Sequence, residues 1–463
     1  MATATGPDTR TLFGHPRGLF VIAGTEVWDR ISFHGMQALL TLYLARELLL
    51  PGHVEHVVGF QIFRHAIEEI TGPLGVKALA TQVFGLYVGF IYMMPAIGGL
   101  IGDRFLGRRV SIILGGLLMT AGHFSMAFDA SFLLAMLFLI FGAGLFRGNL
   151  QPQVGELYER EDRRRSIAFQ IYGAAVNLGA LIAPLVTGVL GKYYGWHIGF
   201  GFAGLGMLVG VVIYTLGGRE LPGRRPAGAS GVSQEPLTRA QWRTILFLLA
   251  LVPVASLFWV AQSQIWNTYN LWVGDHIELH IFGWEMPIPW LQSLDGFAPF
   301  ITLPPVLWLW HWQASKGREP NEFVKAAIGC FIFAVSTWWL GLAGWAADAH
   351  GRAPLLWAVV FHFVSNVGWL YFAPTMTALF SRYAPPAVNA TMIGVYSLSV
   401  TLGSLISGRL GALYERVSPG TFWTIHAALA GLGGIMLLAF GLAAQRTSRA
   451  ISSTAATPAA ADA

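Results

Sequence analysis

Charged residues are scarce in this chain of 463 residues, in which Asp, Glu, Lys and Arg together make up 11%. Soluble globular domains carry about 25% charged residues, so this chain cannot cover a soluble protein of its size with charge. The shortage argues against a cytosolic enzyme, a nucleic-acid-binding protein and a disordered protein. The formal net charge is +5 with scattered basic residues, so we expect no nucleic-acid partner.

Cysteine is almost absent, since Cys330 is the only one and lies in an apolar run. This excludes an intrachain disulfide and a cysteine-based metal site. His276 and His280 are four residues apart, but no third well-spaced ligand accompanies them, so we expect no metal site. The sequence also shows no nucleophile–base pattern and no convincing phosphate-binding glycine loop, so we expect no enzyme.

What the chain has in abundance is apolar sequence, with 54% hydrophobic residues. A helix needs about 20 mainly apolar residues to cross the hydrocarbon core of a bilayer. Twelve stretches meet this requirement, namely 17–46, 80–101, 109–128, 131–151, 166–190, 196–217, 242–273, 289–312, 321–346, 354–382, 388–413 and 420–444. The sequence therefore predicts an all-α polytopic membrane protein with twelve transmembrane helices.

The basic residues favour one side of this arrangement. They gather before the first span, in every second link between spans and in the tail, as in Arg10, Arg17, Arg104, Arg108, Arg109, Arg160, Arg163, Arg164, Arg165, Arg219, Arg224, Arg225, Arg239, Arg243, Lys316, Arg318, Lys325, Arg382, Arg446 and Arg449. The opposite links carry few, such as Lys77 and Lys192. Because Lys and Arg concentrate in cytoplasmic loops, both termini are predicted to be cytoplasmic.

The longest polar link follows the sixth span and is rich in Gly, Pro and Arg, which is typical of a flexible linker. We therefore expect a cytoplasmic N-terminal segment, a six-helix bundle, a cytoplasmic linker, a second six-helix bundle and a disordered cytoplasmic tail, at 1–16, 17–217, 218–241, 242–445 and 446–463. The outward link 50–78 alternates apolar and ionisable residues, so it could form a short amphipathic helix at the membrane surface.

Ionisable residues within the spans are the most informative, because they are costly in hydrocarbon and usually face a cavity or one another. Glu26, Asp29, Arg30 and His34 share one face of the first predicted helix. They form either a protonatable cluster along a pathway or an internal salt bridge that neutralises itself. Arg147, in the fourth span, needs a carboxylate partner in the protein or on a ligand.

Other polar residues stand out against their surroundings. Asn177 and Asp295 interrupt apolar stretches, where they form either a site or an interhelical hydrogen bond. Between the second and third spans, the segment 98–109 (GGLIGDRFLGRR) combines glycines with an acid and arginines. We expect Gly99, Asp103, Arg104 and Arg108 to form a conformational loop at the cytoplasmic surface.

These stretches resemble known sequence motifs. The loop at 98–109 is similar to the signature loop of the major facilitator superfamily. Three stretches are similar to motifs of its proton-coupled oligopeptide transporter (POT) family: 25–36 (TEVWDRISFHGM) to E-x-x-E-R-F-x-Y-Y-G, 142–150 (GAGLFRGNL) to G-x-G-x-K-P-N-I, and 169–180 (FQIYGAAVNLGA) to F-x-x-x-Y-x-x-I-N-x-G. The stretches 290–295 and 368–374 match the family's later helices.

The resemblance implies a 6+6 fold that imports di- or tripeptides, or similar peptide-like solutes, by alternating access. Protons would be the coupling ion, without another cofactor, in a bacterial-type inner membrane whose lipids surround a monomer. It implies proton coupling by Glu26, Asp29 and Arg30, to which we add the titratable His34. The implied substrate-binding residues are Arg30, Tyr92, Arg147, Asn177, Gln264, Asp295 and Trp369.

Several positions depart from the family pattern, and three of them are the most informative. Asp29 stands where the family has a glutamate, and Arg147 where it has a lysine, although an arginine does not lose its proton at ordinary pH. Trp369 replaces a glutamate that in the family faces the amino terminus of the peptide, and Asp295 could supply the missing charge. Transport of another small organic solute with altered coupling, or a non-transporting membrane sensor, therefore stay as alternatives.

Overall fold

The computed structural model describes residues 11–159, 162–222, 237–385 and 388–455. Several predictions lie outside these residues, at 1–10 with Arg10, at Arg160, at 223–236 of the linker with Arg224 and Arg225, and at 456–463 of the tail.

Six long helices form an N-terminal bundle within the described residues. They are α1 (Arg17–Tyr43), α3 (Val76–Ile101), α4 (Arg108–Ser125), α5 (Phe132–Glu156), α6 (Arg164–Tyr194) and α7 (Trp196–Leu216). Six others form a C-terminal bundle, namely α8 (Arg239–Ser263), α10 (Ser293–Ser315), α11 (Glu322–His350), α12 (Leu356–Tyr383), α13 (Asn389–Gly411) and α14 (Pro419–Ala455). Each corresponds to one predicted span, so the all-α polytopic fold is confirmed.

Nine of these long helices, counted over the described residues, are long and apolar enough to cross a membrane. The other three are α1, α4 and α10, which contain polar side chains such as Asp29, Arg108 and Asp295. They still pack against other long helices, α1 against α6 and α7, α4 against α5 and α7, and α10 against α12 and against α6 of the other bundle. All three helices are therefore packed parts of the described fold.

The short elements lie in the links between long helices. Helix α2 (Phe60–Thr71) forms within the link 50–78, as expected, and buries Phe60 and Ile67 on one face. Helix α9 (Thr268–His276) follows α8, and two-residue strands pair as β1 (Thr11–Leu12) with β2 (His15–Pro16) and β3 (His280–Ile281) with β4 (Trp284–Glu285). Helix α14 continues to Ala455, through the first part of the predicted tail.

The seventh predicted span, 242–273, is wrong as one continuous helix. Helix α8 ends at Ser263, and α9 begins after Asn267, whose backbone angles of φ −109° and ψ −106° are not helical. The Asn267 side chain explains the break, because it accepts a hydrogen bond from Thr41 at 3.3 Å and donates one to the Thr81 carbonyl at 3.1 Å. The hydrogen bonds of Asn267 to the other bundle thus stabilise a break between α8 and α9.

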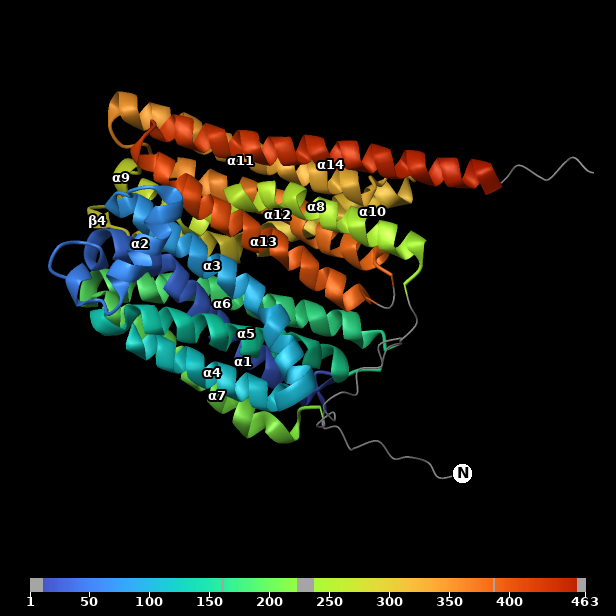
Figure 1. Cartoon of the computed structure of the whole chain (residues 1–463), viewed down its shortest axis with the longest axis horizontal. Helices are drawn as coiled ribbons and strands as arrows, with labels where there is room; N and C mark the ends of the chain where they lie inside the picture. The colour runs from blue at the N-terminus through green and yellow to red at the C-terminus, as the bar shows by residue number, and fades with distance from the viewer. Residues whose placement is uncertain (1–10, 160–161, 223–236, 386–387, 456–463) are drawn as a thin grey trace, which may run out of the picture.

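The two bundles are held together at one end of the molecule, which we call the α2 end, where α2, α9 and β4 lie (Figure 1). Helices α3 and α13 cross there so closely that a Cβ atom on Gly85 would lie 2.6 Å from the Cα of Gly408. Ion pairs join Lys77 to Asp275 at 2.8 Å and Lys192 to Glu285 at 2.9 Å. These contacts close the space between the bundles on this side.

Candidate functional site: a charged cavity between the two bundles

A cavity of about 300 Å³ lies between the bundles. Helices α1, α3 and α6 supply one wall, and α8 with α10 to α13 supply the other. Six of the residues predicted from the sequence line it, namely Arg30, His34, Tyr92, Asn177, Asp295 and Trp369. The structure thus brings together residues that are far apart in the sequence and come from both bundles.

A compact charge cluster lies on the α1 side of the cavity. Asp29 and Glu26 are fully buried, and Arg30 reaches both, with its Nε atom 2.6 Å from Glu26 Oε1 and 3.5 Å from Asp29 Oδ2. Arg147 of α5 donates to both Asp29 oxygens at 3.1 and 3.3 Å. Two carboxylates therefore face two guanidinium groups, so the cluster is balanced in charge while both acids are ionised.

The two arginines have different access to the cavity. Arg30 lines it, whereas Arg147 lies behind Asp29 and is not among the cavity-lining residues of the described chain. The Arg147 guanidinium carbon sits 3.9 Å from the centre of the Phe33 ring, a distance typical of a cation–π contact. Within this arrangement, Arg30 is placed to meet a solute, and Arg147 is placed to hold Asp29.

A second polar group faces the cavity from the C-terminal bundle. Asp295, at the start of α10, accepts a hydrogen bond from His362 Nδ1 at 2.7 Å, and His362 Nε2 lies 2.9 Å from the Tyr269 hydroxyl. Sequence reasoning missed His362 and Tyr269. The signal was present, because a histidine inside an apolar span is rare and usually faces a cavity or another polar group, as do the acids that the sequence analysis did select.

Gln264 takes a different place from the one expected of a substrate-binding residue. It is fully buried and does not line the described cavity. Its amide donates to the Ser407 carbonyl at 2.9 Å and to His426 Nε2 at 3.0 Å. Gln264 therefore ties the turn after α8 to α13 and α14, while its neighbours Gln262 and Ser263 face the cavity.

Aromatic side chains surround the polar groups. Trp259, Trp266 and Trp369 line the C-terminal wall of the cavity. The Trp266 ring lies 4.8 Å from the ring of His34, so aromatic residues of the two bundles meet within the site. This wall offers apolar surface between the guanidinium of Arg30 and the carboxylate of Asp295.

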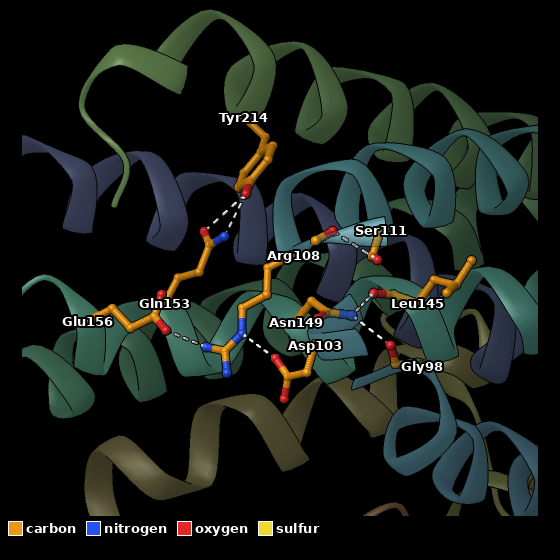
Figure 2. A network of polar contacts seen from close by, with 10 residues as sticks. Gly98, Asp103, Arg108, Ser111, Leu145, Asn149, Gln153, Glu156 and Tyr214 are labelled. Atoms are coloured by element: carbon orange, nitrogen blue, oxygen red, sulfur yellow. Dashed lines mark hydrogen bonds and ion pairs between the residues drawn. The ribbon is translucent and has the colours of Figure 1, made fainter. Parts of the chain in front are cut away.

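The predicted conformational loop lies at the opposite end from α2, where Figure 2 shows its polar network. Arg108 joins Asp103 at 3.0 Å and Glu156 of α5 at 2.7 Å. Asn149 of α5 donates to the carbonyls of Gly98 and Leu145, both at 2.9 Å (Figure 2). The network therefore fastens the turn between α3 and α4 to the end of α5.

The glycines of this loop allow that attachment. A Cβ atom on Gly99 would lie 3.2 Å from the Gly148 carbonyl oxygen, so α3 and α5 pack with their backbones in close approach. Arg104 is exposed on the short turn at 102–106. The four loop residues thus differ in their contacts. Gly99 allows close helix packing, Asp103 and Arg108 form an ion-pair network, and Arg104 is a charge at the surface.

Comparison with known proteins gives a matching family profile and relatives that align over most of both chains. The profile described as Major Facilitator Superfamily matches residues 56–408. The chain is 29% identical to the uncharacterized transporter YclF of Bacillus subtilis (strain 168), over 92% of this chain and 94% of the relative. It is 26% identical to a di-/tripeptide transporter of Lactococcus lactis subsp. lactis (strain IL1403), over 93% of this chain and 96% of the relative.

The fold is also similar to solved structures. A crystal structure of a mutant of the peptide transporter POT in complex with alafosfalin matches with a TM-score of 0.79 and 25% identity. The match covers 94% of this chain and 96% of that chain. The two chains therefore share the overall fold over nearly their full lengths.

Proposed function

This chain belongs to the Major Facilitator Superfamily, and we propose that it imports di- and tripeptides or similar small solutes by proton-coupled alternating access. A di-/tripeptide transporter among its sequence relatives and a POT peptide transporter among the similar structures support this proposal. The family resemblance seen in the sequence is confirmed, and the chain is an integral membrane transporter rather than an enzyme.

One observation carries the substrate class: the cavity presents a guanidinium on one wall and a carboxylate on the other. Arg30 can bind a carboxylate through two parallel hydrogen bonds. Asp295 can accept hydrogen bonds from an ammonium group. A short peptide carries both groups at its two ends, and the volume of about 300 Å³ is at the lower end of the usual range of small-molecule sites.

The charge cluster of the N-terminal bundle supplies a route for coupling. When Glu26 or Asp29 takes a proton, Arg30 loses part of its carboxylate partnership. The released guanidinium can then bind the carboxylate of a solute, and closure of the cavity strengthens the pairing by excluding water. The proton and the solute therefore bind to the same cluster together, so the proton gradient drives accumulation of the solute.

The observed conformation supports import from the α2 end. The distribution of basic residues supports an orientation in which this end lies outside the cell and both termini lie in the cytoplasm. Since the bundles are in contact at the α2 end, the structure corresponds to a state closed to the outside. The protein would work as a single chain among the lipids of a bacterial-type inner membrane, with protons as the only coupling ion.

Trp369 bears on which solutes fit rather than on whether transport occurs. It fills a position of the cavity wall with an indole where the POT motif has an acid, so the acidic partner of an amine shifts to Asp295. A transporter of another small solute would use the same cavity. A sensor would bind a solute without accumulating it, which separates this alternative by experiment.

The proposal is tested with purified protein in proteoliposomes. Labelled Ala-Ala should accumulate inside when the outside is acidic, and a panel of unlabelled di- and tripeptides should compete. Accumulation should collapse when the pH gradient is dissipated. Binding without accumulation would indicate a sensor, and accumulation that ignores the gradient would contradict proton coupling.

A further inference from the structure

His362 connects the cavity wall to the part of the C-terminal bundle that closes the α2 end. Its side chain is fully buried in α12, and it contacts Asp295 of α10 through Nδ1 and Tyr269 of α9 through Nε2. The two distances, 2.7 and 2.9 Å, are those of good hydrogen bonds. One imidazole thus joins three helices at a point where Asp295 meets the cavity.

Helix α9 is the element that reaches across to the N-terminal bundle. The Asn267 side chain, just before α9, bonds to Thr41 and to the Thr81 carbonyl, and Asp275 in its last turn pairs with Lys77 at 2.8 Å. Tyr269 lies between these contacts on the same short helix. A displacement of Tyr269 would therefore act directly on the contacts that hold the α2 end closed.

The hydrogen-bond directions follow from the chemistry of the three groups. An ionised Asp295 can only accept, so Nδ1 of His362 carries a hydrogen and donates it. Nε2 of a neutral imidazole is then an acceptor, and the hydroxyl of Tyr269 donates to it. These directions satisfy all three groups, with the Asp295 carboxylate as the acceptor at the cavity wall.

We propose that His362 is a positioning residue that aims Asp295 at the amino group of the solute and links this site through Tyr269 to the movement of α9. The bond to Nδ1 occupies Oδ1 of Asp295 and leaves Oδ2 as the oxygen for the solute. An ammonium group bound to Oδ2 attracts the Asp295 carboxylate toward the cavity. Because His362 is hydrogen-bonded to Asp295 and to Tyr269, this movement of Asp295 displaces His362 and then Tyr269. This inference rests on the proposed function only in that the solute carries an amine.

The first test measures selectivity for an amine. Affinities of purified protein are compared for Ala-Ala and for N-propionylalanine, which has the same shape without the amine. We expect the wild type to prefer Ala-Ala, and His362→Leu to reduce that preference about ten-fold, the value of one charge-assisted hydrogen bond. His362→Asn should retain most of the preference, because its amide can donate to Asp295 in place of Nδ1.

The second test measures the link to α9. Spin labels on Ile62→Cys and Phe282→Cys, in a Cys330→Ser background, report the separation of the bundles at the α2 end, since both positions are exposed. Ala-Ala should change this distance in the otherwise unaltered protein. Tyr269→Phe and His362→Asn should both keep amine preference and lose the distance change. A residue with a merely structural role would not separate these two readouts.

His426→Asn is the matched control, because His426 is another buried histidine of the C-terminal bundle that contacts Gln264 rather than Asp295. It should leave both readouts unchanged. Amine preference that survives in His362→Leu would overturn the positioning role, and a normal distance change in Tyr269→Phe would overturn the link. If His362→Leu does not fold, Tyr269→Phe and His362→Asn still decide the link.

The outcomes also separate this inference from the proposed function. A wild type that binds Ala-Ala but does not accumulate it refutes transport, while the variants still decide the role of His362. A wild type that transports both ligands equally well keeps the transport function and refutes the amine site. A wild type that binds neither ligand refutes both.

Discussion

Arg147 of α5 holds both carboxylate oxygens of Asp29 of α1, at 3.1 and 3.3 Å, and Asp29 is fully buried. Removing Arg147 leaves the buried Asp29 with only its longer contact to Arg30, at 3.5 Å. Breaking a buried ion pair costs up to about 3–5 kcal/mol, whereas replacing both partners is often neutral. Arg147→Ala should therefore lower the unfolding temperature and stop proton-driven uptake without preventing folding.

A double-mutant cycle checks this prediction. The combination of Asp29→Leu with Arg147→Met should recover most of the thermal stability that each of these two substitutions loses alone, while transport stays absent. Thermal unfolding of the purified variants supplies the measurement. Additive losses in the double variant would show that the pair is not the reason for the instability.

Lys192 and Glu285 form a latch across the α2 end, and this latch should respond to pH. Lys192 donates to the Glu285 carboxylate at 2.9 Å, and this hydrogen bond lowers the pKa of Glu285 below its ordinary value. A carboxyl with a lowered pKa stabilises the latched form above its ordinary pKa, about 4.3. That contribution is lost as the pH falls through the lowered value.

We therefore expect the label distance between Ile62→Cys and Phe282→Cys to lengthen on acidification below about pH 4.3. Glu285→Gln should reduce this change. Glu278→Gln is the control, because the backbone N–H of His280 donates a hydrogen bond to the Glu278 carboxylate and lowers its pKa as well, but this contact stays within one bundle. An equal effect of both variants would refute the latch.

The crossing of α3 and α13 should also set the balance between conformations. A Cβ atom on Gly85 would lie 2.6 Å from Gly408 Cα, so Gly85→Ala should push the bundles apart at the α2 end. The label distance should lengthen in the absence of solute. Gly173→Ala in α6 is the control, since a Cβ there meets nothing within 4 Å. An unchanged distribution in Gly85→Ala would show that the contact is not limiting.

The loop network should govern rate rather than affinity. Arg108 joins Asp103 and Glu156, and none of these three residues lines the described cavity. Arg108→Gln should lower the maximal uptake rate severalfold, because the turn between α3 and α4 is no longer fastened to α5. The binding constant for Ala-Ala should stay within about two-fold. A selective loss of affinity would contradict this role.

Sequence patterns predicted what depends on local composition. The long apolar runs predicted twelve helices, and the spacing of Glu26, Asp29 and Arg30 placed them on one face of α1, where they do cluster. Arg147 was expected to need a carboxylate, and it finds Asp29. These predictions succeed because membrane length, helical period and the cost of a buried charge act on the sequence directly.

Features set by distant contacts were not predictable in this way. The break at Asn267 depends on Thr41 and Thr81 of the other bundle. The partners of His362 lie 67 and 93 residues away, so no local pattern joins them. For Gln264, the family resemblance implied a substrate-binding role, but its side chain points to His426 and Ser407 instead. Tertiary contacts decide all three cases.

The central claim is that the carboxylates of the α1 cluster couple protons to solute movement, and Glu26→Gln tests it most directly. Two uptake modes are measured on the same proteoliposomes: accumulation of labelled Ala-Ala driven by a pH gradient, and exchange of labelled for unlabelled Ala-Ala without a gradient. We predict that Glu26→Gln retains exchange, which needs only the cavity and its movement, and loses gradient-driven accumulation. Accumulation at the wild-type level in this variant would contradict the account.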